Sequence, residues 1–427
     1  MKRIALLLVL SLLLGMDSVL AQSPSSTKPK RVLATGITGQ VKSSGLNNPQ
    51  YVLSFPQIQQ LILQAAKGSV TQAEIDAAVA GTPVKRNDLL RLGLLRQDQN
   101  VYHVAYLVLT VEDQRAIYRV AKEFGIELAR EIEQHRKEFD GFFSRYGDAA
   151  RRGELAFDLV AGMLLNWEGL KLNTELGYRP APVRQPNGDA YFLHSEELGA
   201  DLPEEGMYWG SHSFPGQHIS FSTFGDGASL PRLRGIPDAL FDPVEDGLGN
   251  LKNMPEMEAA ATDEFIAYLS IALTDAGDVM AALADGPQPM SELSRHLNYS
   301  GDRLNATISL LLAAGYIERD GLNYRLRVPI LTERDRPMVN DFLTFGRALL
   351  RTWLTRNYEL IKRELAALSP MRNGLPFTLA FNEVWHYIFG WTTKTLAEDG
   401  FYVNPRSPQY FYRGYVPLVW DSSLYNL

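Results

Sequence analysis

The sequence predicts a mainly helical fold with small β-hairpins, built as two diverged copies of one unit. Residues 89–113, LLRLGLLRQDQNVYHVAYLVLTVED, align without a gap with residues 311–335, LLAAGYIERDGLNYRLRVPILTERD, and eight of these 25 positions are identical. Two more blocks follow in the same order: FGIELAR (124–130) matches FGRALLR (345–351), and LAFDLVAGMLLNW (155–167) matches LAFNEVWHYIFGW (379–391). Offsets of 222, 221 and 224 residues indicate a tandem duplication, so we expect an approximate two-fold relation between the copies.

Copy two has the clearer order of elements. Apolar residues at helical spacing predict helices over 265–283, 290–297 and 304–312, and Gly315 stands where a helix C-terminus favours glycine. Alternating residues on both sides of Asp320-Gly321 predict a β-hairpin.

Three helices followed by a hairpin, over about 278–330, resemble the winged helix-turn-helix superfamily. Copy one has the same order over about 54–110, with helices expected at 58–66, 71–79 and 84–92 and a hairpin turn at 97–100. In that family the third helix enters the major groove of DNA. The resemblance therefore implies these nucleic-acid contacts: Lys85, Arg86 and Arg91 in copy one, and Arg303 and Asn305 in copy two.

The charge of the chain argues against DNA binding. Residues 278–330 carry five arginines against six Asp and Glu residues, and the whole chain has a formal net charge of −7. Binding to a phosphate backbone needs a clear positive excess, because affinity comes mostly from the release of counterions. A nucleic-acid partner is therefore not expected, and a DNA-binding regulator is the last of the functional alternatives.

The first 21 residues have the pattern of a secretory signal peptide. Lys2 and Arg3 precede the apolar run 4–14, and Val19-Leu20-Ala21 gives a small-residue cleavage pattern. The apolar run has 11 residues, which is short for a membrane span. We therefore expect export to the periplasm or the cell exterior, with no membrane span in the mature chain.

The rest of the chain divides by composition and by the repeat. We expect a flexible leader over 22–50 that includes Gly36-Ile37-Thr38-Gly39, repeat unit one over 51–210, an irregular linker over 211–262 and repeat unit two over 263–427. Long helices near 111–145 and 333–368 follow the winged modules and are the expected pairing surface of the copies. Eight aromatic residues in 401–425 predict an extended tail that packs onto the body.

Three histidines are the candidate metal ligands: His194, His212 and His218. Imidazole is a common zinc ligand, and the absence of cysteine leaves no thiolate alternative. Their spacing lacks the i, i+4 pattern that places two ligands on one helix face. Surface or hydrogen-bonding roles are therefore preferred for them, and no cofactor is expected.

Trp167 and Trp391 end the matching helix in the two copies. Core packing is the preferred interpretation, because an aromatic at helical spacing buries a large area. The alternative is a ligand cleft between the copies, walled by both tryptophans together with Tyr208 and Tyr412.

No catalytic constellation emerges from these patterns. The leading hypothesis is an exported, non-catalytic winged-helix protein that acts in interaction or scaffolding, with an unknown protein or small-molecule partner. The alternatives are a small-molecule-binding protein with a cleft between the repeats, a metal-dependent hydrolase that uses the loop histidines, and the DNA-binding regulator.

Overall fold

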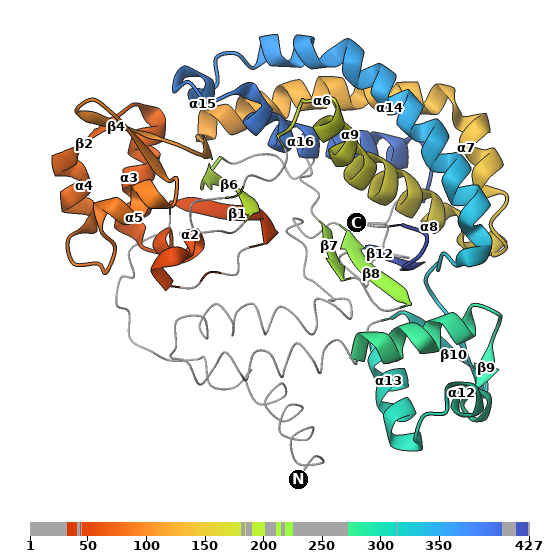
Figure 1. Cartoon of the computed structure of the whole chain (residues 1–427). Coiled ribbons are helices and arrows are strands. Elements are labelled where there is room, and N and C mark those ends of the chain that lie inside the picture. The colour runs from red at the N-terminus through yellow and green to blue at the C-terminus, as the bar shows by residue number, and fades with distance from the viewer. Residues whose placement is uncertain are drawn as a thin grey trace.

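The structure is a computed structural model, and it describes residues 32–40, 43, 45–180, 184, 190–200, 211–214, 218–224, 272–313, 315–403 and 416–425. The protein is mainly helical, with four small three-stranded sheets among these residues. A curved layer of long helices carries one small helix-and-hairpin unit near each end (Figure 1). None of the described helices is long and apolar enough to cross a membrane. The expected signal peptide, residues 1–21, lies outside the described residues.

The first unit (residues 45–109) forms three helices and a hairpin, as its sequence predicts. Its elements are α3 (Pro56–Lys67), β2 (Val70–Thr71), α4 (Gln72–Val79), α5 (Arg86–Arg91), β3 (Leu95–Asp98), β4 (Val101–Val104) and β5 (Leu107–Leu109). The hairpin β3–β4 is joined by β2, which gives the sheet order β2-β4-β3. Ile58, Ile62 and Leu89 pack inside it as parts of its own core.

The second unit (residues 272–331) has the same order of elements. A helix that covers 272–283 comes first. It is followed by β9 (Gln288–Pro289), α12 (Met290–Leu297), α13 (Gly301–Ala313), β10 (Ile317–Asp320) and β11 (Asn323–Leu326). The sheet order β9-β11-β10 repeats the pattern of the first unit. Gly93 and Gly315 follow the third helix of each unit with φ of +67° and +73°, a conformation that favours glycine.

Residues 33–40, expected to belong to a flexible leader, form strand β1 (Leu33–Gln40). It pairs antiparallel with β6 (Ala190–Glu197), and Gly36 lies opposite His194 in that register. Leu33 is buried in the first core, and β5 continues the sheet as a parallel neighbour of β6. The glycines and hydroxyl side chains of β1 obscured its period-two pattern, and its partner strand is far away in sequence.

Each unit leads into a long helix that begins with the same capping box. The hydroxyl of Thr110 accepts from the backbone N–H of Asp113, and the Asp113 carboxylate accepts from the backbone N–H of Thr110 at 2.9 Å. Thr332 and Asp335 form the same box in the second half. Such a box satisfies backbone donors that a helix start would otherwise leave free. The helices that follow are α6 (Val111–Gln134) with its continuation α7 (Arg136–Phe143), and α14 (Arg336–Glu364) after a turn over Glu333–Asp335.

The two long helical segments contact each other, as expected: Phe124 of α6 packs edge-on against Trp353 of α14, and α7 packs along α14. Each segment also packs against a further helix. Helix α6 packs along α16 (Phe377–Glu398), which carries Trp391. Helix α14 packs against α7 and against α9 (Gly169–Glu175) and the π-helix η4 (Asp158–Glu168), which carries Trp167. Helix α8 (Arg152–Phe157) leads into η4. Each long helix therefore packs against the tryptophan-bearing helix of the other half, and one large core contains residues of both halves.

Glycines set the close approach in both of these contacts. A Cβ at Gly125 of α6 would lie 2.5 Å from Trp391 Cβ and 2.7 Å from the carbonyl oxygen of Ile388. A Cβ at Gly346 of α14 would lie 2.6 Å from the side chain of Leu164. A larger residue at Gly125 would push the helices apart, because it meets the backbone of α16, whereas one at Gly346 would require the Leu164 side chain to move.

The segment that we expected to be irregular contains strands. Strands β7 (Ser211–Phe214) and β8 (Ile219–Phe224) form an antiparallel pair, and β12 (Val416–Asp421) from the C-terminal tail adds to β8. Trp420 of β12 lies 5.0 Å from Trp167 between ring centroids, so this part of the tail packs onto the body as predicted. The sheet-forming partners are some 200 residues apart in sequence, which hides their pairing from local pattern analysis.

We predict that Gly125→Ala destabilises the protein by about 1–3 kcal/mol, because the added methyl group overpacks the contact between α6 and α16. Gly141→Ala in α7 is the matched control, since no atom lies within 4 Å of its added Cβ. Replacing an exposed helical glycine should stabilise by about 0.5–1 kcal/mol. Urea unfolding of both variants measures the difference, and equal midpoints would contradict the close packing.

Candidate functional site

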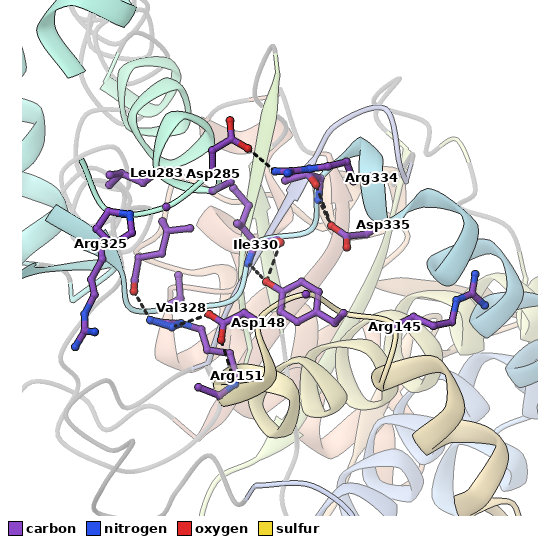
Figure 2. A pocket seen from close by; sticks show the side chains of 18 residues that line it. Arg145, Asp148, Arg151, Leu283, Asp285, Arg325, Val328, Ile330, Arg334 and Asp335 are labelled. Atoms are coloured by element: carbon purple, nitrogen blue, oxygen red, sulfur yellow. Dashed lines mark hydrogen bonds and ion pairs between the residues drawn. The ribbon is translucent and has the colours of Figure 1, made fainter. Parts of the chain in front are cut away.

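A cleft lies between the end of the first long helix and the second unit (Figure 2). Its volume is about 620 Å³, within the range of small-molecule sites. The first half contributes the turn 145–151, and the second half contributes 283–287 and 325–335. The cleft is therefore built by two parts of the chain that are far apart in sequence.

Tyr146 joins the two walls of this cleft. Its hydroxyl donates to the carbonyl oxygen of Ile330 at 3.1 Å and accepts from the Ile330 N–H at 3.2 Å. Burial raises the pKa of the Tyr146 phenol, so it stays protonated and keeps the donating bond. This pair of bonds fixes the turn after α7 against the segment that leads into α14.

The polar side chains of the cleft are arginines and aspartates that mostly pair with one another. Arg334 Nη2 lies 2.7 Å from Asp285 Oδ1, and this pair closes one edge of the cleft in Figure 2. Arg151 donates to the carbonyl oxygen of Leu326, and its Nη1 lies 3.4 Å from Asp148 Oδ2. Arg325 pairs outside the cleft with Glu318 at 2.8 Å.

One donor of the cleft has no acceptor. The Nε of Arg151 is buried and makes no hydrogen bond, and the whole side chain is only 16% exposed. A buried donor without an acceptor is costly, so a small movement of Arg151 that lets Nε meet an acceptor would be favourable. The other groups suit binding better than catalysis, because the Thr332 hydroxyl is used in the capping box and Tyr146 is held neutral.

A second cavity, of about 400 Å³, lies at the start of α6. Thr110 and Asp113 line it, as Thr332 and Asp335 line the first cleft. Its other wall is the turn after α14 with α15 (Ser369–Arg372), and the Ser369 N–H donates to Asp113 Oδ1 at 2.8 Å. Both cavities thus lie between the capping box of one half and the turn after the long helix of the other half.

A buried polar cluster lies between β6 and α16. His194 Nδ1 is 3.5 Å from Glu383 Oε1, and Asn382 Nδ2 donates to that same oxygen at 2.6 Å. Burial, and then the nearby charge of Glu383, raises the pKa of Glu196 to about 7. Burial lowers the pKa of His386, whose Nδ1 hydrogen bonds to the carbonyl oxygen of Asn382 at 2.7 Å.

Gly36 makes room for this cluster. A Cβ at Gly36 would lie 2.3 Å from His194 Cε1, so the imidazole ring rests directly on the backbone of β1. His194 is therefore not a loop residue, because its side chain lies in the interior between β1 and α16.

The three candidate metal ligands are not brought together by the described residues. His194 lies in the buried cluster, whereas His218 is exposed at the start of β8. His212 lies in β7, and its side chain is outside the described residues. Within the described part of the chain, no group of three or more His, Asp or Glu side chains is placed to hold a metal ion.

Trp167 and Trp391 are buried in the large core, with 6% and 2% of their surface exposed. Trp167 stacks on Tyr425, and Trp391 makes an edge contact with Tyr118. Neither lines either of the two cavities. Tyr208 and Tyr412, the other expected walls of a ligand cleft, lie outside the described residues.

The basic residues of the third helices are largely engaged within the protein. Arg303 makes two hydrogen bonds to Asp275, one of them at 2.7 Å from Nε to Oδ2. Arg91 pairs with Asp88 at 3.0 Å and also donates to Asn47 at 2.7 Å. The remaining candidates, Lys85, Arg86 and Asn305, lie on or beside these helices. A guanidinium group that is paired with a carboxylate contributes less to the binding of a phosphate backbone.

Sequence reasoning missed the residues of both sites. Tyr146 and Ile330 are 184 positions apart, and no local pattern connects them. The only available signal for the cleft was the turn-forming run Tyr146-Gly147-Asp148 directly after a long helix, followed by Arg151. For the buried cluster, the available signal was the alternation of apolar and polar residues along β6, which predicts a strand.

We predict that Glu196→Gln alters the pH dependence of stability. Because the folded pKa of Glu196 is raised from 4.5 to about 7, its stabilising contribution is fully present below about pH 4.5 and is lost as the pH rises through 7. Between pH 4.5 and 8 the unfolding free energy of wild type should therefore fall by up to about 3 kcal/mol more than that of the Gln variant. The contribution of His386, which has the opposite sign, is common to both proteins.

Denaturant unfolding at a series of pH values measures this difference. Glu398→Gln, at the far end of α16, is the control and should follow the wild-type profile. Parallel profiles for wild type and Glu196→Gln would show that Glu196 titrates normally in the folded protein.

No protein-family model matches the chain, and neither a curated protein nor a solved structure is similar to it. The cleft and the buried cluster are therefore the features from which a function is inferred.

Proposed function

We propose that this protein is a non-catalytic binding protein that holds a small molecule in the cleft between its two halves. The observation that carries the proposal is the cavity of about 620 Å³ whose walls come from both halves of the chain. In this proposal the two units are winged-helix modules, and residues 1–21 direct the chain out of the cytoplasm.

The proposal includes descent of the two halves from one duplicated unit, related by an approximate two-fold axis. It is supported by the matching sheet orders β2-β4-β3 and β9-β11-β10. The capping boxes Thr110–Asp113 and Thr332–Asp335 fall at equivalent positions of the aligned blocks. Gly125 and Gly346, also equivalent, each contact the tryptophan-bearing helix of the other half. Two-fold exchange of this kind is typical of homodimers.

The pseudo-symmetry also supports a binding role for the cleft. The two cavities occupy equivalent places, each at a capping box and against the turn after the opposite long helix. Pockets at such interfaces between packed modules are frequent ligand sites. Binding there would stabilise the contact between the second unit and the helical layer.

The test is whether the purified full chain retains a small molecule that depends on the cleft. Native mass spectrometry of the wild-type protein should detect a bound species, and Ala150→Trp, which fills the cleft, should abolish it. Ala306→Trp, on the exposed face of α13 and away from the cleft, is the control and should retain the ligand. A species that Ala150→Trp retains would contradict the proposal.

A second candidate function is scaffolding, because the two units lie near opposite ends of the helical layer and could engage partners separately (Figure 1). At the tip of the second hairpin, Leu322 is 91% exposed. In this candidate the side chain of Leu322 would become buried against the partner as an apolar anchor.

A photo-crosslinking residue at position 322 tests this second candidate. We expect one discrete protein adduct from position 322 and none from position 100, the aligned position at the tip of the first hairpin. Equal labelling from both positions, or none from either, would remove the argument from Leu322.

A further inference from the structure

We propose that the cleft takes an anionic small molecule, one that carries a carboxylate or phosphate group, with Arg151 as the residue that binds the anion. This inference rests on the proposed function and adds the chemical class of the ligand. The hydrogen-bonding groups that line the cleft support this assignment.

Arg151 lines the cleft and has one unused donor. Its Nη2 donates to the carbonyl oxygen of Leu326, which anchors the guanidinium to the second unit. Its nearest carboxylate oxygen, Asp148 Oδ2, is 3.4 Å from Nη1, which is long for a charge-assisted hydrogen bond. Its Nε is buried without an acceptor. A small shift of the side chain would let Nε meet a ligand oxygen, and a ligand oxygen at Nη1 could take the place of the long contact to Asp148.

The carboxylates that could repel an anion have partners of their own. Asp335 Oδ2 accepts from Thr332 N at 2.8 Å and from the Thr332 hydroxyl at 3.0 Å. Asp148 accepts from the Ala150 N–H at 3.1 Å, and Asp285 accepts from Arg334 at 2.7 Å. Each aspartate is thus engaged by a donor, and the lining has four arginines against three aspartates, an excess of one positive charge.

The arrangement of the arginines favours a ligand with more than one anionic oxygen. Arg151 comes from the helical wall and Arg334 from the second unit. Arg145 and Arg325 also line the cleft, but carboxylates outside it hold them, at 2.7 Å and 2.8 Å. Arginine carries five N–H donors in a planar fork, which suits carboxylate and phosphate oxygens. A ligand that spans from Arg151 to Arg334 would bridge the two walls that Tyr146 already joins. The volume of about 620 Å³ accommodates a small organic anion of this kind.

The test uses the full chain freed of any retained molecule, with citrate and inorganic phosphate as probes in isothermal titration calorimetry at fixed ionic strength. We expect saturable binding of at least one probe by wild type. Arg151→Gln should weaken it roughly 10- to 100-fold, the range expected for a lost charge-assisted hydrogen bond. Arg295→Gln, an exposed arginine of α12 outside the cleft, is the control and should bind as wild type does.

Arg334→Gln provides a second variant that leaves the fold intact, because both members of its pair with Asp285 are about two-thirds exposed. It should weaken binding severalfold while its thermal unfolding stays at the wild-type temperature. If Arg151→Gln, Arg334→Gln and the control Arg295→Gln all bind a probe as wild type does, the anion binds elsewhere and the inference is overturned. A wild-type protein that binds neither probe would also overturn it.

Failure of this inference can be told apart from failure of the proposed function. An uncharged or cationic molecule that is retained by wild type and by Arg151→Gln, but lost in Ala150→Trp, overturns the anion assignment and keeps the cleft as the binding site. A retained molecule that Ala150→Trp does not displace overturns both.

Discussion

Close approach at two glycines sets how the halves of this protein fit together. Gly125 lets α6 lie against the backbone of α16, and Gly346 lets α14 lie against Leu164 of the π-helix. Because interiors are packed as densely as organic crystals, an added methyl group at Gly125 must displace the backbone of α16, and one at Gly346 must displace the Leu164 side chain. The large core that results contains side chains from both halves, including Leu164, Trp353 and Trp385. Neither half could bury these side chains alone.

The positions of the small units follow from the positions of the long helices. Each long helix begins at a threonine-aspartate capping box, directly after the last strand or extended segment of its unit. The box fixes where helical hydrogen bonding starts, so the unit before it is held at a set place on the layer. Since each helix ends against the other half, the turn after one helix meets the start of the other. Cavities at those two meeting points are a geometric consequence of the exchange.

Local patterns in the sequence predicted the helices and hairpins of both units, because periodicity, the glycines after the third helices and the hairpin turns are all local properties. Strand β1 was missed since Gly36 and Gly39 dilute its alternation and its partner β6 is about 150 residues away. The contact of α6 with α16 was not predicted, for a related reason. The glycine contacts that bring a further helix onto each long helix join residues far apart in the sequence. The residues of the cleft and of the Glu196 cluster meet through the same long-range contacts.

The two equivalent cavities differ in a way that favours the first as a ligand site. In the second cavity the Ser369 N–H reaches Asp113 directly, so the turn after α14 lies on the helix start and leaves about 400 Å³. In the first cavity the corresponding turn is held through Tyr146 to the backbone of Ile330, and about 620 Å³ remains open. A tyrosine ring is a longer connection than one backbone amide, so the walls stand further apart. The two turns therefore differ in how closely they approach the helix start: one cavity is narrowed, and the other stays open beside the unsatisfied donor of Arg151.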